Sequence, residues 1–362
     1  MKGNLLLGGV KIEKKEIKKV AVLGAGYMGS AITFPLFDSG HSVNLWGTWL
    51  DDDIINTCRK GPHPKLGTPL RDGVKTYLSG DLADAVSDVQ CIFVAVSSEG
   101  FIPVFRKFLE TGRDVCPVLC LTKGFVEDRG RVKRISRWAE DEWSSRFSGE
   151  RFEWISIGGP VKATELSRMI PSASIYGVSS DSSRELAGTV STPYYRVFPY
   201  GDVAGVELSS AFKNAYAIGL GICDGIYKRR NEEDYHNICG IIFNAAIGEM
   251  AEIVERAGGD KGAVYSLAGV GDLYVTGRSG RNRRFGELIG AGSTPKDSYE
   301  KMMGEGELAE GYDAVAKGVH WYEEQQKGRL DDLPLLKTLY RIVIRGKSPE
   351  EEIYSFIEGC GC

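Results

Sequence analysis

One lysine in an apolar helix points most clearly to chemistry. Residues 206–221 read VELSSAFKNAYAIGLG, and after Ser210 only Lys213 and Asn214 interrupt the apolar and small side chains. A helix that is apolar on nearly every face is buried, so an ammonium group on it needs a partner or a lowered pKa. Such a lysine can give and take a proton near neutral pH. The plainer alternative is a lysine whose ammonium group reaches the surface.

A lone acid and a basic cluster follow this helix. Asp272, in the segment Gly269-Val-Gly-Asp-Leu273, is expected in a small, flexible turn, where it could pair with Lys213 and fix its position. Guanidinium groups and an amide such as Asn282 suit phosphate oxygens, and a helix beginning in this segment would add backbone N–H groups. A solvated basic loop is the alternative. The cluster consists of Arg278, Arg281, Arg283 and Arg284.

A glycine-rich turn near the start of the chain is typical of dinucleotide binding. Gly24-Ala-Gly-Tyr-Met-Gly29 follows an apolar run at 19–23 and precedes a predicted helix at 27–38 and a second strand at 41–46. Gly24 permits the tight turn, Gly26 lets the backbone approach a pyrophosphate, and Gly29 lets the helix lie close to the strand. N–H groups of the first helical turn would attract the phosphates. A glycine-rich loop without a ligand is the alternative.

The residues after the second strand leave the choice of dinucleotide open. An acid at that strand end would hold the ribose 2′-hydroxyl of NAD, and a basic residue would hold the 2′-phosphate of NADP. Gly47 and Thr48 stand there instead, followed by Asp51, Asp52 and Asp53. We expect NAD, with NADP as the alternative, because the nearest charges are acidic and would repel a 2′-phosphate.

The elements that must position these residues fall into two groups. Strand-like runs at 91–96, 118–121, 154–157, 173–178 and 194–198 alternate with helical segments, which predicts a parallel, doubly wound sheet. Lys123 and the Gly158-Gly-Pro160 loop follow strand ends, so both are expected around the crevice of the glycine-rich turn. Segments 204–228, 234–258, 307–327 and 333–345 read as helices. We therefore predict an extension at 1–18, a dinucleotide-binding domain at 19–200 and a helical domain at 201–362.

Composition bounds the remaining possibilities. The chain has 362 residues, of which 42% are hydrophobic and 26% charged, and this length is enough for two domains. A net charge of −4 argues against non-specific nucleic-acid binding, and no apolar stretch approaches the roughly eighteen residues of a membrane helix. The eight cysteines match neither a disulfide framework nor a metal site, which favours a reducing, cytoplasmic compartment. The Cys360-Gly-Cys362 end is expected to be reduced.

Combined, these features predict hydride transfer to or from a small phosphorylated molecule. At this point the chain resembles the NAD(P)-dependent glycerol-3-phosphate dehydrogenases over roughly residues 18–345. The segments that carry the likeness stand in family order: the glycine-rich turn, Thr122-Lys-Gly124, Gly159-Pro160 with Ala163, Lys213-Asn-Ala-Tyr-Ala-Ile218, Gly271-Asp-Leu273, Arg281-Asn-Arg-Arg-Phe-Gly286 and Glu310-Gly-Tyr312.

The resemblance implies a fold, a reaction and a set of roles. The fold would be α/β, with an N-terminal Rossmann-type doubly wound parallel sheet and an all-helical C-terminal domain. The enzyme would interconvert dihydroxyacetone phosphate and sn-glycerol 3-phosphate for lipid and glycerol metabolism, as a homodimer. Lys213 would carry the proton, with Asp272 beside it. Lys123 would orient the substrate and contact the cofactor, Arg281 and Asn282 would lie near the substrate phosphate and the cofactor, and Gly159 and Ala163 would line the pocket. Glu310 would reach the nicotinamide, and Tyr27 and Met28 would lie along the pyrophosphate.

The chain departs from the family at a few positions, and two rival classes remain. Ser97 stands where the family usually has Pro, and Thr164 and Lys162 replace a lysine and an aromatic residue of many bacterial members. A ketopantoate or opine-type reductase would keep the turn and a lysine but would have less reason for the arginines. A catalytically silent nucleotide-sensing module could lose Lys213 or Asp272, and both are present.

Overall fold

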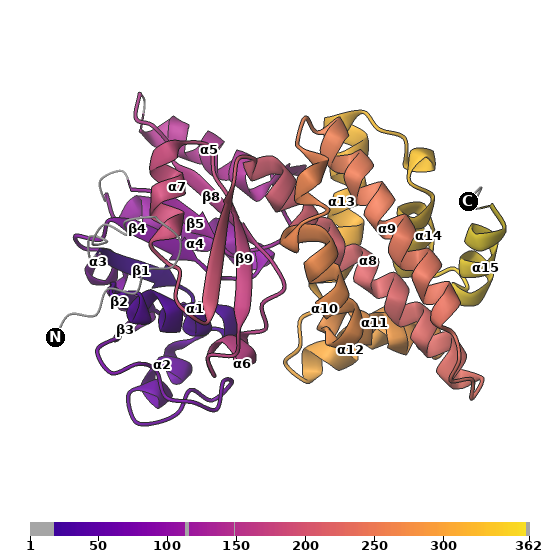
Figure 1. Ribbon diagram of the computed structural model, residues 1–362, viewed down its shortest axis with the longest axis horizontal. Coiled ribbons are helices and arrows are strands. Elements are labelled where there is room, and N and C mark those ends of the chain that lie inside the picture. Colours follow the sequence, from indigo (N-terminus) through magenta and orange to yellow (C-terminus); the bar gives the residue numbers. More distant parts are fainter. Residues whose placement is uncertain (1–17, 113–115, 148, 360–362) are drawn as a thin grey trace, which may run out of the picture.

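The computed structural model describes residues 18–112, 116–147 and 149–359, and shows a sheet-containing lobe beside a helical lobe (Figure 1). The first lobe is built on an eight-stranded sheet in the order β10-β9-β8-β5-β4-β1-β2-β3. Its strands are β1 (Lys19–Leu23), β2 (Ser42–Trp46), β3 (Lys75–Tyr77), β4 (Cys91–Val94), β5 (Val118–Cys120), β8 (Trp154–Gly158), β9 (Ser172–Gly177) and β10 (Tyr195–Tyr200).

Helices cover both faces of this sheet. Along β1, Val20 and Val22 point into one hydrophobic core and Ala21 and Leu23 into another, as the period of two along a strand requires. The helices of this lobe are α1 (Tyr27–Asp38), α2 (Asp52–Cys58), α3 (Leu82–Ala85), α4 (Ser98–Glu110), α5 (Ile135–Arg146), α6 (Ala163–Leu166) and α7 (Asp181–Gly188). Helices α1 and α7 pack on the first core, and α4 and α5 on the second.

The second lobe is helical within the part of the chain that the structure describes. It consists of α8 (Val203–Arg229), α9 (His236–Arg256), α10 (Asp272–Ser279), α11 (Arg281–Gly290), α12 (Pro295–Gly304), α13 (Glu310–Gln326), α14 (Pro334–Val343) and α15 (Pro349–Gly359). Helix α8 is its centre, because every residue from Gly205 to Ile226 is buried. The amino-terminal half of α8 also packs on β8 and β9, so this helix joins the two lobes.

The predicted fold class is confirmed, and two local features differ from the expectation. Strand β9 runs antiparallel to β8 although it is parallel to β10. A separate antiparallel hairpin, β6 (Phe125–Asp128) with β7 (Arg131–Arg134), was not predicted. Its strands are short and carry several charges, so they lack the apolar run from which the buried strands were recognised.

The sheet-containing lobe gives way to the helical lobe near residue 200, because the last strand ends at Tyr200 and α8 begins at Val203. Two predicted segments lie outside the described residues: the extension at 1–18, apart from Lys18, and the Cys360-Gly-Cys362 end. Contrary to the expectation from composition, α9 is long and apolar enough to cross a membrane. It packs against α8 and α14 in the helical core, however, and core helices of globular proteins pass the same test.

Candidate active site

Two lysines and an aspartate from three distant segments meet between the lobes. The Lys213 ammonium lies 2.9 Å from Oδ1 of Asp272, and the Lys123 ammonium lies 2.5 Å from Oδ2 of the same carboxylate. Lys213 is 5% exposed and Asp272 3%, whereas the Lys123 side chain is 21% exposed. The structure thus brings the three residues into one cluster and excludes the reading of Lys213 as a surface lysine.

Burial and the neighbouring charges shift the pKa values of Lys213 and Asp272. Removal from water lowers the pKa of Lys213 to about 8, with the attraction of Asp272 opposing the shift and the repulsion of Lys123 adding to it. Burial alone would raise the pKa of Asp272, but the two ammonium groups outweigh it and hold that pKa below its usual range. The carboxylate therefore stays ionised while Lys213 can exchange a proton close to neutral pH.

The local backbone explains how Asp272 reaches Lys213. Asp272 is the first residue of α10 and follows a π-helical turn, Leu267–Gly271, so the expectation of a flexible turn was wrong. Such wide turns are frequent at functional sites, and this one aims the carboxylate at the neighbouring α8. Thr276, one helical turn later, accepts a hydrogen bond from Lys213 at 2.7 Å and donates one to Asp272 at 3.1 Å.

Glycines bring the arginine segment close to α8. A Cβ on Gly221 or Gly225 of α8 would overlap the backbone of α11, and one on Gly286 or Gly290 of α11 would overlap the backbone of α8. The two helices therefore cross at backbone contact. This crossing places the first turn of α11 next to the lysine cluster, where Asn282 contacts Asn214 beside Lys213. Helix α11 begins at Arg281, so the arginine segment does open a helix.

The side chain of Asn282 is already engaged by protein. Its Nδ2 donates to Oδ1 of Asn214 at 2.8 Å, and its Oδ1 accepts from the backbone N–H of Gly311 at 2.8 Å. Asn214 in turn donates to Oε2 of Glu310 at 3.4 Å. Both amides are buried. Asn282 thus ties α8, α11 and α13 together, and each of its two polar side-chain atoms makes one of the two hydrogen bonds that it can make.

The four arginines differ in their partners and in how closely they contact them. Arg281 is 46% exposed and lies 3.6 Å from Oε1 of Glu310. By contrast, Arg283 pairs with Asp224 and Glu287, and Arg284 with Glu305 and Glu307, while Arg278 lies over the Tyr274 ring. Arg281, whose ion-pair contact is the longest of these, is therefore the arginine least engaged by an acid among the three that are paired, and the phosphate site stays a prediction.

The glycine-rich turn has the geometry that a pyrophosphate requires. Gly24 has φ of +110°, and a Cβ there would lie 2.6 Å from the Ala95 carbonyl oxygen, while one on Gly29 would overlap the Gly24 carbonyl oxygen. A Cβ on Gly26 would meet no described atom within 4 Å, and no side chain caps the first turn of α1. The free N–H groups and the open space above Gly26 therefore fit a dinucleotide.

The remaining predicted residues follow the carboxyl ends of β1 and β8. Tyr27 is 46% exposed and Met28 half-buried at the start of α1. The Gly159 carbonyl, just after β8, lies 3.5 Å from the Lys123 ammonium, and Ala163 begins α6, which packs against α1. The structure thus places all of them at one edge of the sheet.

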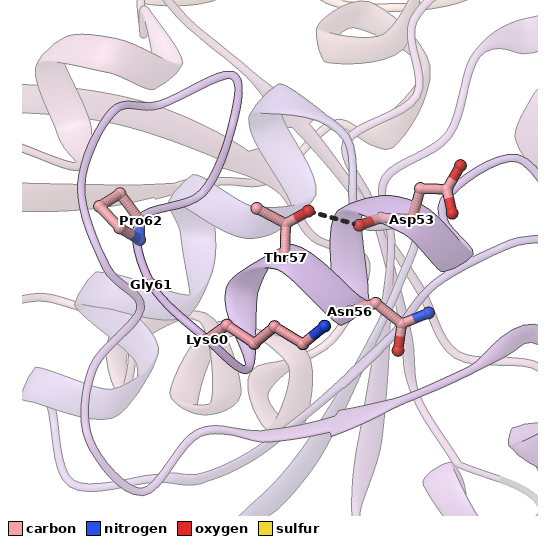
Figure 2. A pocket seen from close by; sticks show the side chains of 6 residues that line it. All are labelled: Asp53, Asn56, Thr57, Lys60, Gly61 and Pro62. Carbon is pink, nitrogen blue, oxygen red and sulfur yellow. Dashed lines mark hydrogen bonds between the residues drawn. The ribbon is translucent and has the colours of Figure 1, made fainter.

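Two shallow hollows lie outside this cluster. One of about 490 Å³ lies at α2 and the segment that follows it, and is lined by Asp53, Asn56, Thr57, Lys60, Gly61 and Pro62 (Figure 2). The other, of about 440 Å³, runs along α11 and includes Arg281 at its edge. The six residues around the first hollow include none from the glycine-rich turn or the lysine cluster, so it is not part of the crevice described above.

Sequence reasoning missed Thr276 as a site residue. The signal was present, because Thr276 stands four residues after Asp272, and residues at that spacing share a helix face. It went unused because the segment was interpreted as a flexible turn.

A doubly wound sheet with a dinucleotide turn, a helical second lobe and a buried lysine at the crevice define a nicotinamide-dependent dehydrogenase. Comparison with known proteins narrows this class. Residues 19–183 match the N-terminal model, and residues 202–354 the C-terminal model, of NAD-dependent glycerol-3-phosphate dehydrogenase. The chain belongs to this family.

Individual relatives and a solved structure that the chain resembles are also glycerol-3-phosphate dehydrogenases. The chain is 33% identical over 338 residues to the NADP(+)-dependent glycerol-3-phosphate dehydrogenase of Archaeoglobus fulgidus, covering 92% of this chain and 98% of the relative. It is 27% identical to a glycerol-3-phosphate dehydrogenase [NAD(P)+] of Oceanobacillus iheyensis, covering 93% of each. The crystal structure of glycerol-3-phosphate dehydrogenase from Coxiella burnetii is similar with a TM-score of 0.80 at 26% identity, covering 94% of this chain and 99% of that one.

Proposed function

We propose that this chain reversibly reduces dihydroxyacetone phosphate to sn-glycerol 3-phosphate with NAD(H) or NADP(H). The observation that carries the proposal is the buried Lys213 ammonium, fixed by Asp272 beside the strand ends where the glycine-rich turn lies. When bound, the nicotinamide supplies or accepts the hydride at the carbonyl carbon.

Lys213 moves the proton in this scheme. In the reductive direction its ammonium gives a proton to the carbonyl oxygen, and in the oxidative direction the neutral amine takes the proton from the hydroxyl group. A pKa of about 8 suits both directions, because an acid or base works best when its pKa lies near the working pH. Asp272 and Thr276 hold the amine in place, and Lys123 orients the substrate and contacts the cofactor from the opposite side of Asp272.

The phosphate of the substrate binds at the start of α11. Arg281 offers a partly exposed guanidinium group there, and the backbone N–H groups of the first helical turn add to the attraction, including that of Asn282. Gly159 lines the opposite wall. A charged group held far from the reacting carbon lets binding energy position that carbon.

The dinucleotide extends from the glycine-rich turn toward the lysines. Gly24, Gly26 and Gly29 shape the turn, and Tyr27 and Met28 contribute the first N–H groups of α1 to the pyrophosphate. Ala163 and Glu310 border the nicotinamide end, where Glu310 also meets Arg281. NAD remains the expected cofactor, with NADP as the alternative.

The cellular setting forms the remaining part of the proposal. We place the enzyme in the cytoplasm as a homodimer that provides glycerol phosphate for lipid and glycerol metabolism. The cysteine pattern, which matches no disulfide framework, supports the compartment, and the resemblance to the family supports the assembly. Light scattering of the purified chain tests the assembly, since a mass of one chain would contradict it.

Oxidation of NADH and of NADPH in separate cuvettes, with dihydroxyacetone phosphate added last, tests the reaction. We expect absorbance loss that depends on the phosphorylated ketone with at least one cofactor. Equal rates with unphosphorylated dihydroxyacetone would contradict the phosphate site. Turnover of ketopantoate or of an opine precursor instead would favour the rival reductases, and binding of dinucleotide without turnover would favour a sensing module.

A further inference from the structure

The backbone of Ala25, in the middle of the glycine-rich turn, is bound at its N–H and at its carbonyl by side chains from outside the turn. The N–H group of Ala25 donates to Oδ2 of Asp51 at 3.2 Å, and its carbonyl oxygen lies 3.2 Å from Nε2 of His63. Asp51 is 8% exposed and His63 is fully buried. The two residues come from the segments before and after α2, so they reach the turn from a part of the lobe that the glycine motif does not include.

The hydrogen bonds of His63 fix its tautomer. Nδ1 accepts from the backbone N–H groups of Lys65 and Leu66 at 3.1 and 3.2 Å, so it carries no proton. Nε2 therefore carries the proton and donates it to Ala25. The charged groups near the ring are Lys65 and Asp51, and burial lowers the pKa of His63, which keeps the ring neutral.

Asp51 uses one carboxylate oxygen for three donors. Besides Ala25, Oδ2 accepts from the backbone N–H of Thr48 at 3.0 Å and from its hydroxyl at 2.8 Å. Asp51 precedes α2 but does not cap that helix with its side chain. Asp52 is engaged as well, because Ser79 donates to it through its N–H and its hydroxyl, both at 2.8 Å. Two of the acids that favoured NAD therefore bind protein groups.

The turn needs such support because its own residues provide little. Gly24 and Gly26 give the backbone wide freedom, which costs conformational entropy when it is fixed. No side-chain cap stabilises the first turn of α1, so its N–H groups stay free for an anion. Peptide groups that are already fixed on both sides of Ala25 remove this cost from the binding step.

We propose that Asp51 and His63 are positioning residues that hold the two peptide groups on either side of Ala25 so that the N–H groups of Tyr27 and Met28 face the pyrophosphate, and that Asp51 does not contact the ribose. This proposal rests on the dinucleotide site of the proposed function. A positioning role affects NADH and NADPH alike, because both carry the same pyrophosphate. A ribose contact would affect them differently, because only the 2′ position distinguishes the two cofactors.

Dissociation constants of NADH and NADPH, measured by fluorescence titration, test the proposal. We expect Asp51→Ala to weaken both cofactors by the same factor, about tenfold, as for the loss of a charged hydrogen-bond acceptor. His63→Asn, which can keep the acceptor but not the donor to Ala25, should act similarly. His63→Gln, whose amide can replace Nε2, should restore most of the affinity. The exposed Asp53→Asn on the same helix controls for charge alone and should leave both constants within about twofold of wild type.

Melting temperatures of the same variants are measured alongside, so that an effect on cofactor binding can be separated from an effect on stability. A loss confined to NADH in Asp51→Ala would overturn the proposal and make Asp51 a ribose ligand. A lower melting temperature with unchanged dissociation constants would also overturn it, because the two residues would then serve stability alone. If Asp51→Ala does not fold, the proposal is tested by His63→Asn and His63→Gln instead, and equal dissociation constants in these two variants would overturn it. If the unmodified chain binds neither cofactor, the proposed function fails together with this inference, whereas binding that survives all variants contradicts only the inference.

Discussion

The two ends of the crevice handle charge in opposite ways. At the glycine-rich turn, the proposed anion site offers backbone N–H groups and open space at Gly26, and the first turn of α1 carries no acidic side chain. At the other end, three formal charges, Lys123, Asp272 and Lys213, are brought together in a largely buried cluster. In the proposed function, the first arrangement would bind a permanently charged group, whereas the second would change its protonation during the reaction. Substitutions at the turn should therefore alter affinity, and substitutions in the cluster should alter the chemical step.

Lys213→Ala should have the largest effect. We expect kcat to fall by about a thousandfold, the middle of the range for loss of a general acid, while the dissociation constant of NADH changes little. Steady-state rates and fluorescence titration measure the two quantities. Lys228→Ala, near the exposed end of the same helix, is the matched control and should keep nearly full activity. Retained turnover in Lys213→Ala would remove its assignment as proton donor.

Arg281→Ala should act mainly on the binding of the substrate. We expect the KM for dihydroxyacetone phosphate to rise roughly ten- to a hundredfold, from the loss of a charged hydrogen bond worth about 1.5–3 kcal/mol. Arg284→Ala, which removes an arginine already paired with Glu305 and Glu307, should change KM by less than about threefold. Equal effects of the two substitutions would show that the arginines act only through their overall charge.

Gly26→Ala separates the binding role of the turn from its folding role. A methyl group at Gly26 meets no described protein atom, so the melting temperature should stay unchanged while the dissociation constant of NADH rises by about tenfold, because the methyl group would occupy the approach to the pyrophosphate. Gly29→Ala should instead lower the melting temperature, because its Cβ would overlap the Gly24 carbonyl oxygen. An unchanged NADH affinity in Gly26→Ala would count against the site.

Thr276→Val should have the smallest effect. It removes one neutral hydrogen bond to Lys213 and one to Asp272, so we expect kcat to fall by about fivefold with little change in KM. A Thr276→Ser variant, which keeps the hydroxyl, should recover most of the rate. If the serine variant is as impaired as the valine variant, the methyl packing of Thr276 matters and not its hydroxyl.

Local sequence patterns predicted much of this molecule because they report local physics. The burial of Lys213 followed from the apolar faces of its helix, and the crowding of Gly24 and Gly29 followed from the strand-turn-helix motif. Features that depend on distant partners could not be predicted. Arg283 has Asp224 as its partner, and Asp51 turns toward Ala25, only because the fold brings those residues together. Thr276 could have been predicted, because it stands four residues after Asp272 and would have shared its helix face had the segment been interpreted as a helix.

The pH dependence of kcat in wild type and Asp272→Asn tests the central claim most directly. Lys213 donates from its protonated form, so the reductive kcat should be level at neutral pH and fall as pH rises through about 8, while the oxidative kcat rises through the same range. Because Asp272 raises the pKa of Lys213 against the effect of burial, Asp272→Asn should move both limbs to lower pH. A reductive limb that stays in place in Asp272→Asn, or that is absent in wild type between pH 7 and 9, would contradict proton transfer by the buried lysine.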